Sequence, residues 1–372
     1  MDLSVIIVSY NSRFFLELCL SSVRVATKNI KSEIIVVDNN SEDDSIKMIE
    51  SLFSEVLLIE NKINLGFSSA NNLGVKKAKG KHICFLNPDT VVSENLFNKI
   101  LEFKESNNNV GIIGCKMIDG QGNFLPESKR NLPTISMVIK KFIGLKNNYY
   151  LHAISEDEIG QSDVLSGAIM LINKKEFEDV GGFNEQYFMF GEDIDLSHKM
   201  INKGLKNYYL GNLSIIHYKG ESTLKNNKYY RSFYGAMGIY YRKFIASNIF
   251  SKFLSYFIIE LIVFFYLFKL KSKPQFMDNL RNSYIVSDKD YHGLKSRGTK
   301  RIESVKSVLN KLESCEIIFD SNHLTFNDII DRMQKLSNNK NIRFKILSKG
   351  SNFIIGSNNS KEQGEVILFD LN

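Results

Sequence analysis

Two groups of acidic residues, far apart in the chain, have the composition of reactive sites. Glu192, Asp193 and Asp195 lie within four residues and follow the aromatic run Phe188-Met189-Phe190. A second acidic site, Asn87-Pro88-Asp89-Thr90, follows an apolar run upstream. One carboxylate site can hold a cation against a diphosphate, and the other can take a proton from a hydroxyl. These are the two tasks of sugar transfer.

The elements that must position these residues alternate between apolar strands and amphipathic helices over residues 3 to 115. Five strands are predicted, at Leu3–Val8, Ile34–Val37, Val56–Ile59, Ile83–Leu86 and Val110–Gly114. Their continuous Val, Ile and Leu runs are typical of a parallel sheet that is buried on both faces. Ser12 marks the start of the first helix, and Ser41 with Asp44 predicts a capping box for the second. The pattern predicts a doubly wound α/β fold, which binds ligands beyond the carboxyl ends of its strands.

Polar residues follow four consecutive strands at this edge of the sheet. They are Ser9-Tyr10-Asn11, Asp38-Asn39-Asn40-Ser41, Asn64-Leu65-Gly66-Phe67 with Asn71-Asn72, and Asn87-Pro88-Asp89. Each group alone could be a turn or a helix cap, because these residue types favour both. Their joint placement at one edge favours a binding site.

A second block of elements begins near residue 163. It contains a strand around Ala168–Ile172, a short helix at Lys174–Val180 and a helix from Glu192 to Asn202 that stops before Gly204. Carboxylates in a first turn stabilise a helix through its dipole, which is a structural reason for one or two of these acids. It does not explain why they follow the aromatic run.

The ordered motifs resemble glycosyltransferase family 2, the inverting enzymes of the GT-A fold, and within it the rhamnosyltransferase-like bacterial members. The resemblance covers roughly residues 1 to 245. It rests on the four polar groups above, on Val5-Ile6-Ile7-Val8 before them, and on four segments downstream, namely Ser166-Gly167-Ala168, Gly181-Gly182-Phe183-Asn184-Glu185, Phe188–Leu196 and His217-Tyr218-Lys219-Gly220-Glu221-Ser222.

The resemblance implies a role for each matching residue. The donor, a nucleoside-diphosphate sugar, would contact Ser9, Tyr10, Asn11, Asp38, Asn64, Gly66, Phe67 and Asn87. Asp89, with His217, would hold a divalent cation, Mg²⁺ or Mn²⁺, although a structural role for His217 stays open. Asp193 would be the general base with Glu192 beside it, and Ser166, Gly167 and Asp195 would bind the acceptor. Many GT-A enzymes have a strict Asp-x-Asp where this chain offers only Asp89.

Composition sets limits on partners and compartment. The formal charge of +7 over 372 residues fits anionic substrates or an acidic membrane face, and is too diffuse to indicate nucleic acid. The four cysteines are far apart and form no CxxC, which predicts buried free thiols in a reducing compartment. No secretory signal is visible, so we expect a cytoplasmic protein.

The most apolar segment is Ser251–Phe268, whose 18 residues would span about 27 Å as a helix, just under the ~30 Å hydrocarbon core. Glu260 lies near its middle, and lysines flank it on both sides. We expect a helix lying on the inner membrane surface, with a single span and a packed core or oligomer helix as alternatives.

Four regions follow from these patterns. They are a GT-A domain over 1–245 (donor half about 1–120, acceptor half about 121–245), a membrane-associating helix over 246–273, a linker over 274–300 and a small α/β domain over 301–372. No chemistry is assigned to the last region, and oligomerisation stays open. The segment Ser128–Pro133 either approaches the acceptor or forms a solvated loop.

The expected function is therefore sugar transfer, with inversion, to a glycan or lipid-linked acceptor in bacterial surface polysaccharide synthesis. A nucleotidyltransferase is one alternative, but Ser9–Phe15 lacks the Gly-rich signature and lysine of that class. A non-catalytic sugar-nucleotide or polysaccharide-binding module is another, and the presence of Asp89 and Asp193 disfavours it.

Overall fold

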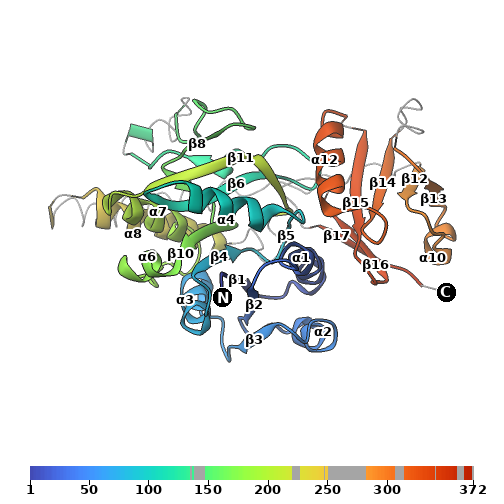
Figure 1. Cartoon of the computed structure of the whole chain (residues 1–372), viewed down its shortest axis with the longest axis horizontal. Coiled ribbons are helices and arrows are strands. Elements are labelled where there is room, and N and C mark those ends of the chain that lie inside the picture. Colours follow the sequence, from blue (N-terminus) through green and yellow to red (C-terminus); the bar gives the residue numbers. More distant parts are fainter. Residues whose placement is uncertain are drawn as a thin grey trace.

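The computed structural model describes residues 1–134, 136–137, 147–219, 227–246, 248–249, 282–305, 314–339, 341–357 and 364–370. Two sheets organise these residues (Figure 1). We call the part before residue 250 the N-terminal unit and the part from residue 282 the C-terminal unit.

The sheet of the N-terminal unit has the strand order β3-β2-β1-β4-β10-β6-β11-β5, with β8 paired to β11. Its strands are β1 (Leu3–Ser9), β2 (Ser32–Asp38), β3 (Leu57–Glu60), β4 (His82–Leu86), β5 (Thr90–Val91), β6 (Val110–Ile118), β8 (Ile159–Gln161), β10 (Ile169–Asn173) and β11 (Lys206–His217). Strands β3, β2, β1 and β4 are parallel, as predicted, whereas β10 runs antiparallel between β4 and β6.

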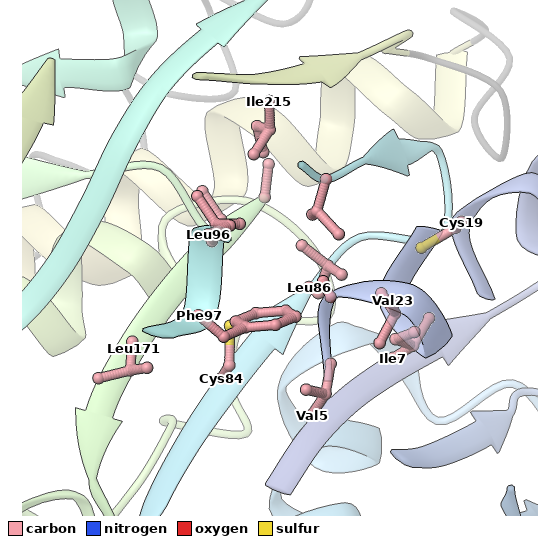
Figure 2. Close-up of a cluster of buried hydrophobic side chains, with 14 of the residues drawn as sticks. Val5, Ile7, Cys19, Val23, Cys84, Leu86, Leu96, Phe97, Leu171 and Ile215 are labelled. Atoms are coloured by element: carbon pink, nitrogen blue, oxygen red, sulfur yellow. The ribbon is translucent and has the colours of Figure 1, made fainter. Parts of the chain in front are cut away.

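Helices cover both faces of this sheet, which confirms the doubly wound α/β class. They are α1 (Arg13–Ala26), α2 (Ser45–Leu52), α3 (Gly66–Lys77), α4 (Leu96–Ser106), α6 (Lys174–Asp179), α7 (Glu192–Asn202) and α8 (Asn227–Phe244). Alternate residues of β1 enter different cores, because side chains of a strand alternate between its faces. Val5 and Ile7 pack with α1, α2 and α4 (Figure 2), whereas Ile6 packs with α3, α6 and α7.

A two-stranded ladder and a short 3₁₀ turn complete the N-terminal unit. The turn spans Pro126–Ser128 and leads into β7 (Lys129–Arg130), which pairs antiparallel with β9 (Val164–Leu165). This ladder brings the loop before residue 135 against the strand region that precedes β10.

The C-terminal unit is a six-stranded sheet of order β13-β12-β14-β15-β16-β17. Its strands are β12 (Asn282–Val286), β13 (Lys300–Ile302), β14 (Cys315–Asp320), β15 (Ile342–Leu347), β16 (Phe353–Gly356) and β17 (Glu365–Leu368), with helices α10 (His292–Lys295) and α12 (Phe326–Leu336). The predicted linker over 274–300 is wrong from residue 282 onward. The polar residues there surround a short apolar run, and β12 pairs with two neighbours in this sheet.

Some predictions lie outside the described residues. The apolar segment Ser251–Phe268, with Glu260, is among them. Within the parts of the chain that are described, we find no helix long and apolar enough to cross a membrane. All four cysteines are described, and each is buried and free, as expected.

Candidate active site

The carboxyl ends of β1 and β2 bring together the first residues that are predicted to bind the sugar donor, since Ser9 pairs with Asp38 in the parallel register. Asp38 is fully buried, and its two oxygens accept hydrogen bonds from the Ser41 N–H at 2.8 Å and the Ser41 hydroxyl at 2.6 Å. The Asn11 N–H donates to the same hydroxyl at 2.9 Å. Ser41 therefore joins the two strand ends. The predicted capping box is wrong, because α2 begins at Ser45 and Asp44 makes no cap bond.

The loop around Gly66, which is also predicted to bind the sugar donor, is hydrogen-bonded to the segment before α7. Gly66 has a φ of +79°, and a Cβ there would stand 2.5 Å from the Phe188 carbonyl oxygen, so only glycine fits. The Phe67 N–H donates to that same oxygen at 2.7 Å, and the Asn64 side chain accepts from the Gly66 N–H at 2.9 Å. Asn39, which the sequence did not single out, donates to the Gly66 carbonyl at 3.1 Å. The asparagine pair after β2 was the available signal.

Asp89 and His217 meet at the edge of the sheet, where β5 pairs antiparallel with the end of β11. His217 Nε2 lies 3.4 Å from Asp89 Oδ1 and 3.3 Å from Asn87 Nδ2. Burial alone would raise the pKa of the Asp89 carboxyl, but the charge and hydrogen bond of His217, with nearby main-chain N–H groups, lower it below its ordinary value. Asp89 is thus held as a carboxylate.

This pair fits part of the coordination shell of a small divalent cation. Metal–ligand bonds of about 2.1 Å place neighbouring octahedral ligands about 3 Å apart, close to the Asp89–His217 separation. The Nδ1 atom of His217 is buried and lacks a hydrogen-bond partner in the described structure. Within that structure, no group of three or more His, Cys, Asp or Glu side chains could hold a metal ion. The two residues fit a cation that takes its other ligands from a diphosphate and water.

Asp193, the second residue of α7, is held by three donors. Its Oδ2 accepts from Arg130 Nη2 at 2.6 Å and from the Gly167 N–H at 3.2 Å, and its Oδ1 accepts from the Ile194 N–H at 2.8 Å. Charge-assisted bonds of this kind stabilise the ionised carboxylate. The acidic helix start therefore presents a fixed carboxylate, 13% exposed at its side chain.

The sequence left the role of Arg130 undecided. This residue is buried, and it also donates to the Leu165 carbonyl at 2.9 Å and the Tyr149 hydroxyl at 3.1 Å. Burial would lower the pKa of its guanidinium, but the Asp193 carboxylate raises that pKa above its ordinary value. The solvated-loop alternative for this segment is wrong, because Lys129 is buried as well. A basic pair in a polar loop gave no signal for this contact.

Glu192 lies beside Asp193 in a different state. It is buried, and its Oε2 has no hydrogen-bond partner among the described residues. Burial, together with the charge of Asp193, raises the pKa of Glu192 to about 8. Burial and the neighbouring negative charge thus favour the protonated form of Glu192, a perturbation that is common where acid–base chemistry is carried out.

The turn at Ser166–Ala168 borders both carboxylate sites. The Asn87 N–H donates to the Ala168 carbonyl at 3.0 Å, and the Gly167 N–H reaches Asp193. A Cβ on Gly167 would stand 3.5 Å from the Asp193 Cβ and 3.9 Å from the Phe67 ring. The fold thus brings the cation pair, the donor loop and the proposed base around one turn.

Asp195 is not part of this arrangement. It is fully buried, and it binds Lys243 at 2.7 Å, Lys199 at 3.2 Å and the Tyr187 hydroxyl at 3.3 Å. Lys243 belongs to α8, so Asp195 joins α8 to α7. This buried, ion-paired environment does not favour acceptor binding.

The loop before α7 is strained, which is common at functional sites. Phe190 has a φ of +72°, a conformation that bulky residues rarely adopt, and Gly191 follows at +80°. The Phe190 ring packs edge-on against Tyr229 at 5.0 Å and Phe233 at 5.7 Å between centroids. The aromatic run therefore anchors α8 next to the acidic helix start.

Several known glycosyltransferases are similar to this chain in sequence. Residues 4–181 match the family described as glycosyl transferase family 2, and residues 155–240 match the one described as the N-terminal domain of galactosyltransferase. The chain is 26% identical over 238 residues to an N-acetylglucosaminyl-diphospho-decaprenol L-rhamnosyltransferase of Mycobacterium tuberculosis (strain CDC 1551 / Oshkosh), covering 59% of this chain and 77% of that protein. It is 27% identical over 223 residues to the rhamnosyltransferase WbbL of Escherichia coli (strain K12), covering 58% of this chain and 82% of that protein.

Among solved structures, a mannosyltransferase from Pyrobaculum calidifontis, in complex with GDP-Man and Mn²⁺, is similar with a TM-score of 0.49 at 14% identity. The similarity covers 73% of this chain and 76% of that one. The sequence matches define the class: residues 4–181 carry a glycosyltransferase family 2 domain, and the relatives include bacterial rhamnosyltransferases. The chain is a glycosyltransferase, and the nucleotidyltransferase and non-catalytic alternatives are set aside.

Proposed function

We propose that this enzyme transfers a sugar, with inversion, from a nucleoside-diphosphate sugar to a hydroxyl of a glycan or lipid-linked acceptor. The observation that carries the proposal is the meeting of two carboxylate sites at the Ser166–Ala168 turn. The Asp89–His217 pair would hold the cation that binds the leaving diphosphate. Asp193 would accept the proton of the attacking hydroxyl.

Asp193 would act as the general base. Arg130, the Gly167 N–H and the Ile194 N–H hold its carboxylate in one orientation. The acceptor hydroxyl gives its proton to this carboxylate while its oxygen bonds to the anomeric carbon and the diphosphate leaves. A base on the face opposite the leaving group produces inversion. Neutral Glu192 adds no second negative charge beside the developing bond.

The cofactor would be a divalent cation, Mg²⁺ or Mn²⁺, held by Asp89 and His217. When bound, it would offset the charge of the leaving diphosphate. Asn87 contacts His217 and so orients the ring. Ser9, Tyr10, Asn11, Asp38, Asn64, Gly66 and Phe67 would bind the donor, and their bonds with Ser41 and Phe188 fix the two donor loops.

The substrate class follows from the relatives. Their names point to rhamnose as the donor sugar, with another hexose as the alternative, and one names a diphospho-polyprenol acceptor. Such an acceptor would require contact with a membrane. The apolar segment Ser251–Phe268 and its flanking lysines support a peripheral protein on the cytoplasmic face of the inner membrane, acting in surface polysaccharide synthesis.

The test is a transfer assay with the full chain. The protein is incubated with dTDP-rhamnose, UDP-sugars or GDP-sugars, with Mn²⁺ or Mg²⁺, and with a polyprenyl-diphosphate-linked GlcNAc acceptor. We expect release of nucleoside diphosphate that depends on the acceptor, and a product whose anomeric configuration is inverted by NMR. Retention of configuration, or no transfer from any donor in the panel, would overturn the proposal.

A further inference from the structure

We infer that the C-terminal unit positions the Asp89–His217 pair, through a carboxylate contact made by Glu94 and through the packing around Tyr218. The inference rests on the proposed function for the role of that pair. It assigns a task to a unit in which no chemical motif was found.

The first step concerns the edge strand β5. It has only two residues and pairs with the end of β11 alone. An edge strand this short has little stability of its own, because pairing on one side leaves it dependent on packing. Val91 of β5 and Ile216 of β11 are fully buried in an apolar cluster that continues into the C-terminal unit. Its C-terminal members include Phe319, Phe344, Phe326, Ile330 and Met333.

The second step concerns Tyr218, which directly follows His217. Its N–H donates to the Asp89 carbonyl at 3.0 Å, so Asp89 and His217 are tied together through the main chain. Its ring is 1% exposed and packs edge-on against Phe15 of α1, with 5.0 Å between centroids. The preceding residue, Phe14, packs against Phe353 of β16, also at 5.0 Å.

The third step is a charged contact between the units. Glu94 lies five residues after Asp89, and its two oxygens accept from the Phe326 N–H at 2.7 Å and the Asn327 N–H at 3.0 Å. These N–H groups form the first turn of α12, where a carboxylate satisfies free donors and the helix dipole together. Figure 1 shows α12 and the C-terminal sheet lying beside α1 and β5. The segment that carries Asp89 is thus attached to α12.

Two neutral contacts extend this attachment around β6 and β11. Gln121 donates to the Ser357 carbonyl at 2.8 Å, and Ser214 contacts Gln334 at 3.3 Å. A Cβ at Gly122 would stand 2.2 Å from the Met333 carbonyl oxygen, so the two backbones meet directly there. By contrast, Asp193 is held by Arg130 and Gly167, which are not in these contacts. Loosening α12 should therefore weaken the cation pair and leave the proposed base in place.

The experiment compares Glu94→Ala with Asp331→Ala. The second variant is the control, because it removes an exposed carboxylate of α12, the helix that Glu94 contacts. The first readout is hydrogen exchange of the Tyr218 amide in protein without added metal. We expect exchange at least about tenfold faster in Glu94→Ala, equivalent to 1.4 kcal/mol, and no change in Asp331→Ala. The second readout is binding of Mn²⁺ with nucleoside diphosphate, followed by electron paramagnetic resonance, where the half-saturating Mn²⁺ concentration should rise about tenfold.

A split between kinetic constants separates positioning from general damage. The acceptor KM should stay within about twofold in Glu94→Ala, while the cation and donor requirements rise. Glu94→Gln keeps an oxygen acceptor without the charge, so an intermediate effect is expected; it also serves if the alanine variant does not fold. Equal Tyr218 exchange and equal Mn²⁺ titration in the Glu94 and Asp331 variants would overturn the inference. A wild type that binds no Mn²⁺ with any nucleotide would instead reject the proposed function, and the exchange comparison would still decide the inference.

Discussion

Both units place a buried carboxylate at the carboxyl end of a parallel strand, yet the two differ in how it is satisfied. In the C-terminal unit, Asp320 is the last residue of β14 and is fully buried. Its Oδ2 accepts from the Ser287 hydroxyl at 2.6 Å and the Tyr291 hydroxyl at 2.8 Å, and its Oδ1 accepts from Asn322 twice at 2.8 Å. Both oxygens of Asp320 are thus satisfied by donors of the same unit.

In the N-terminal unit Asp38 is satisfied in the same way, by Ser41, but two of the candidate-site residues are not. Glu192 has a buried oxygen without a described partner, and Asp193 stands beside it. Asp89 faces a histidine in a pair that lacks the further ligands of a metal site. Leaving buried polar groups in this state costs stability, so such groups are expected where a substrate or cation completes them. The fold alone therefore does not define a site. The polar atoms that have no partner within the described part of the protein mark it.

The largest effect should come from Asp193→Asn, which removes the proton acceptor and keeps the shape. Transfer should fall by about 10²–10⁴, the usual contribution of a general base, while donor affinity stays within about twofold. Initial rates and calorimetric donor titration check this. Asp179→Asn, at an exposed ion pair, is the matched control and should retain wild-type rates. Near-normal turnover of the Asp193 variant would remove this residue from the mechanism.

Asp320→Ala should act on stability and not on chemistry. It leaves the hydroxyls of Ser287 and Tyr291 without their acceptor, which should cost about 3 kcal/mol of unfolding free energy. Urea titration measures this, with Asp331→Ala expected within about 0.5 kcal/mol of wild type. A fall in the transfer rate of folded Asp320→Ala protein would contradict this contrast between the two units.

Asp89→Ala should weaken cation-dependent donor binding by about tenfold or more, or about 1.4 kcal/mol, because it deletes the carboxylate of the cation pair. Titration of the donor with and without Mn²⁺, in wild type and variant, gives the result. If all four affinities agree, the enzyme works without a metal and the cation assignment is wrong.

The smallest effect concerns pH. The pKa of Glu192, at about 8, lies above its ordinary value near 4.5, so folding favours the protonated form. Stability from this group is complete below pH 4.5 and is lost as the pH rises toward 8. Glu192→Gln does not titrate, so the unfolding free energy of this variant relative to wild type should rise between pH 5 and pH 8. A pH-independent difference in urea unfolding would show that Glu192 is already ionised at pH 5.

The sequence by itself determined the first strands of the N-terminal sheet, the bounds of α7 and its acidic first turn, because these depend on local patterns. The run Val5–Val8 predicted a strand buried on both faces, and α7 begins and ends where its acids and Gly204 indicate. Apolar spacing, capping residues and helix breakers act over a few residues, so the order of elements can be read from them.

Only the tertiary structure decided which residues meet. Arg130 reaches Asp193 across 63 positions of sequence, and Asn87 and His217 meet across 130. Ser41 bonds to Asp38 where a helix cap was expected, since a buried carboxylate at a strand end takes the nearest donors. Asp195, two residues from the proposed base, points to Lys199 and Lys243 and is fully buried, because neighbouring helix positions face different directions. Charge pairing and burial across distant segments set these roles, and neither leaves a periodic trace in one sequence.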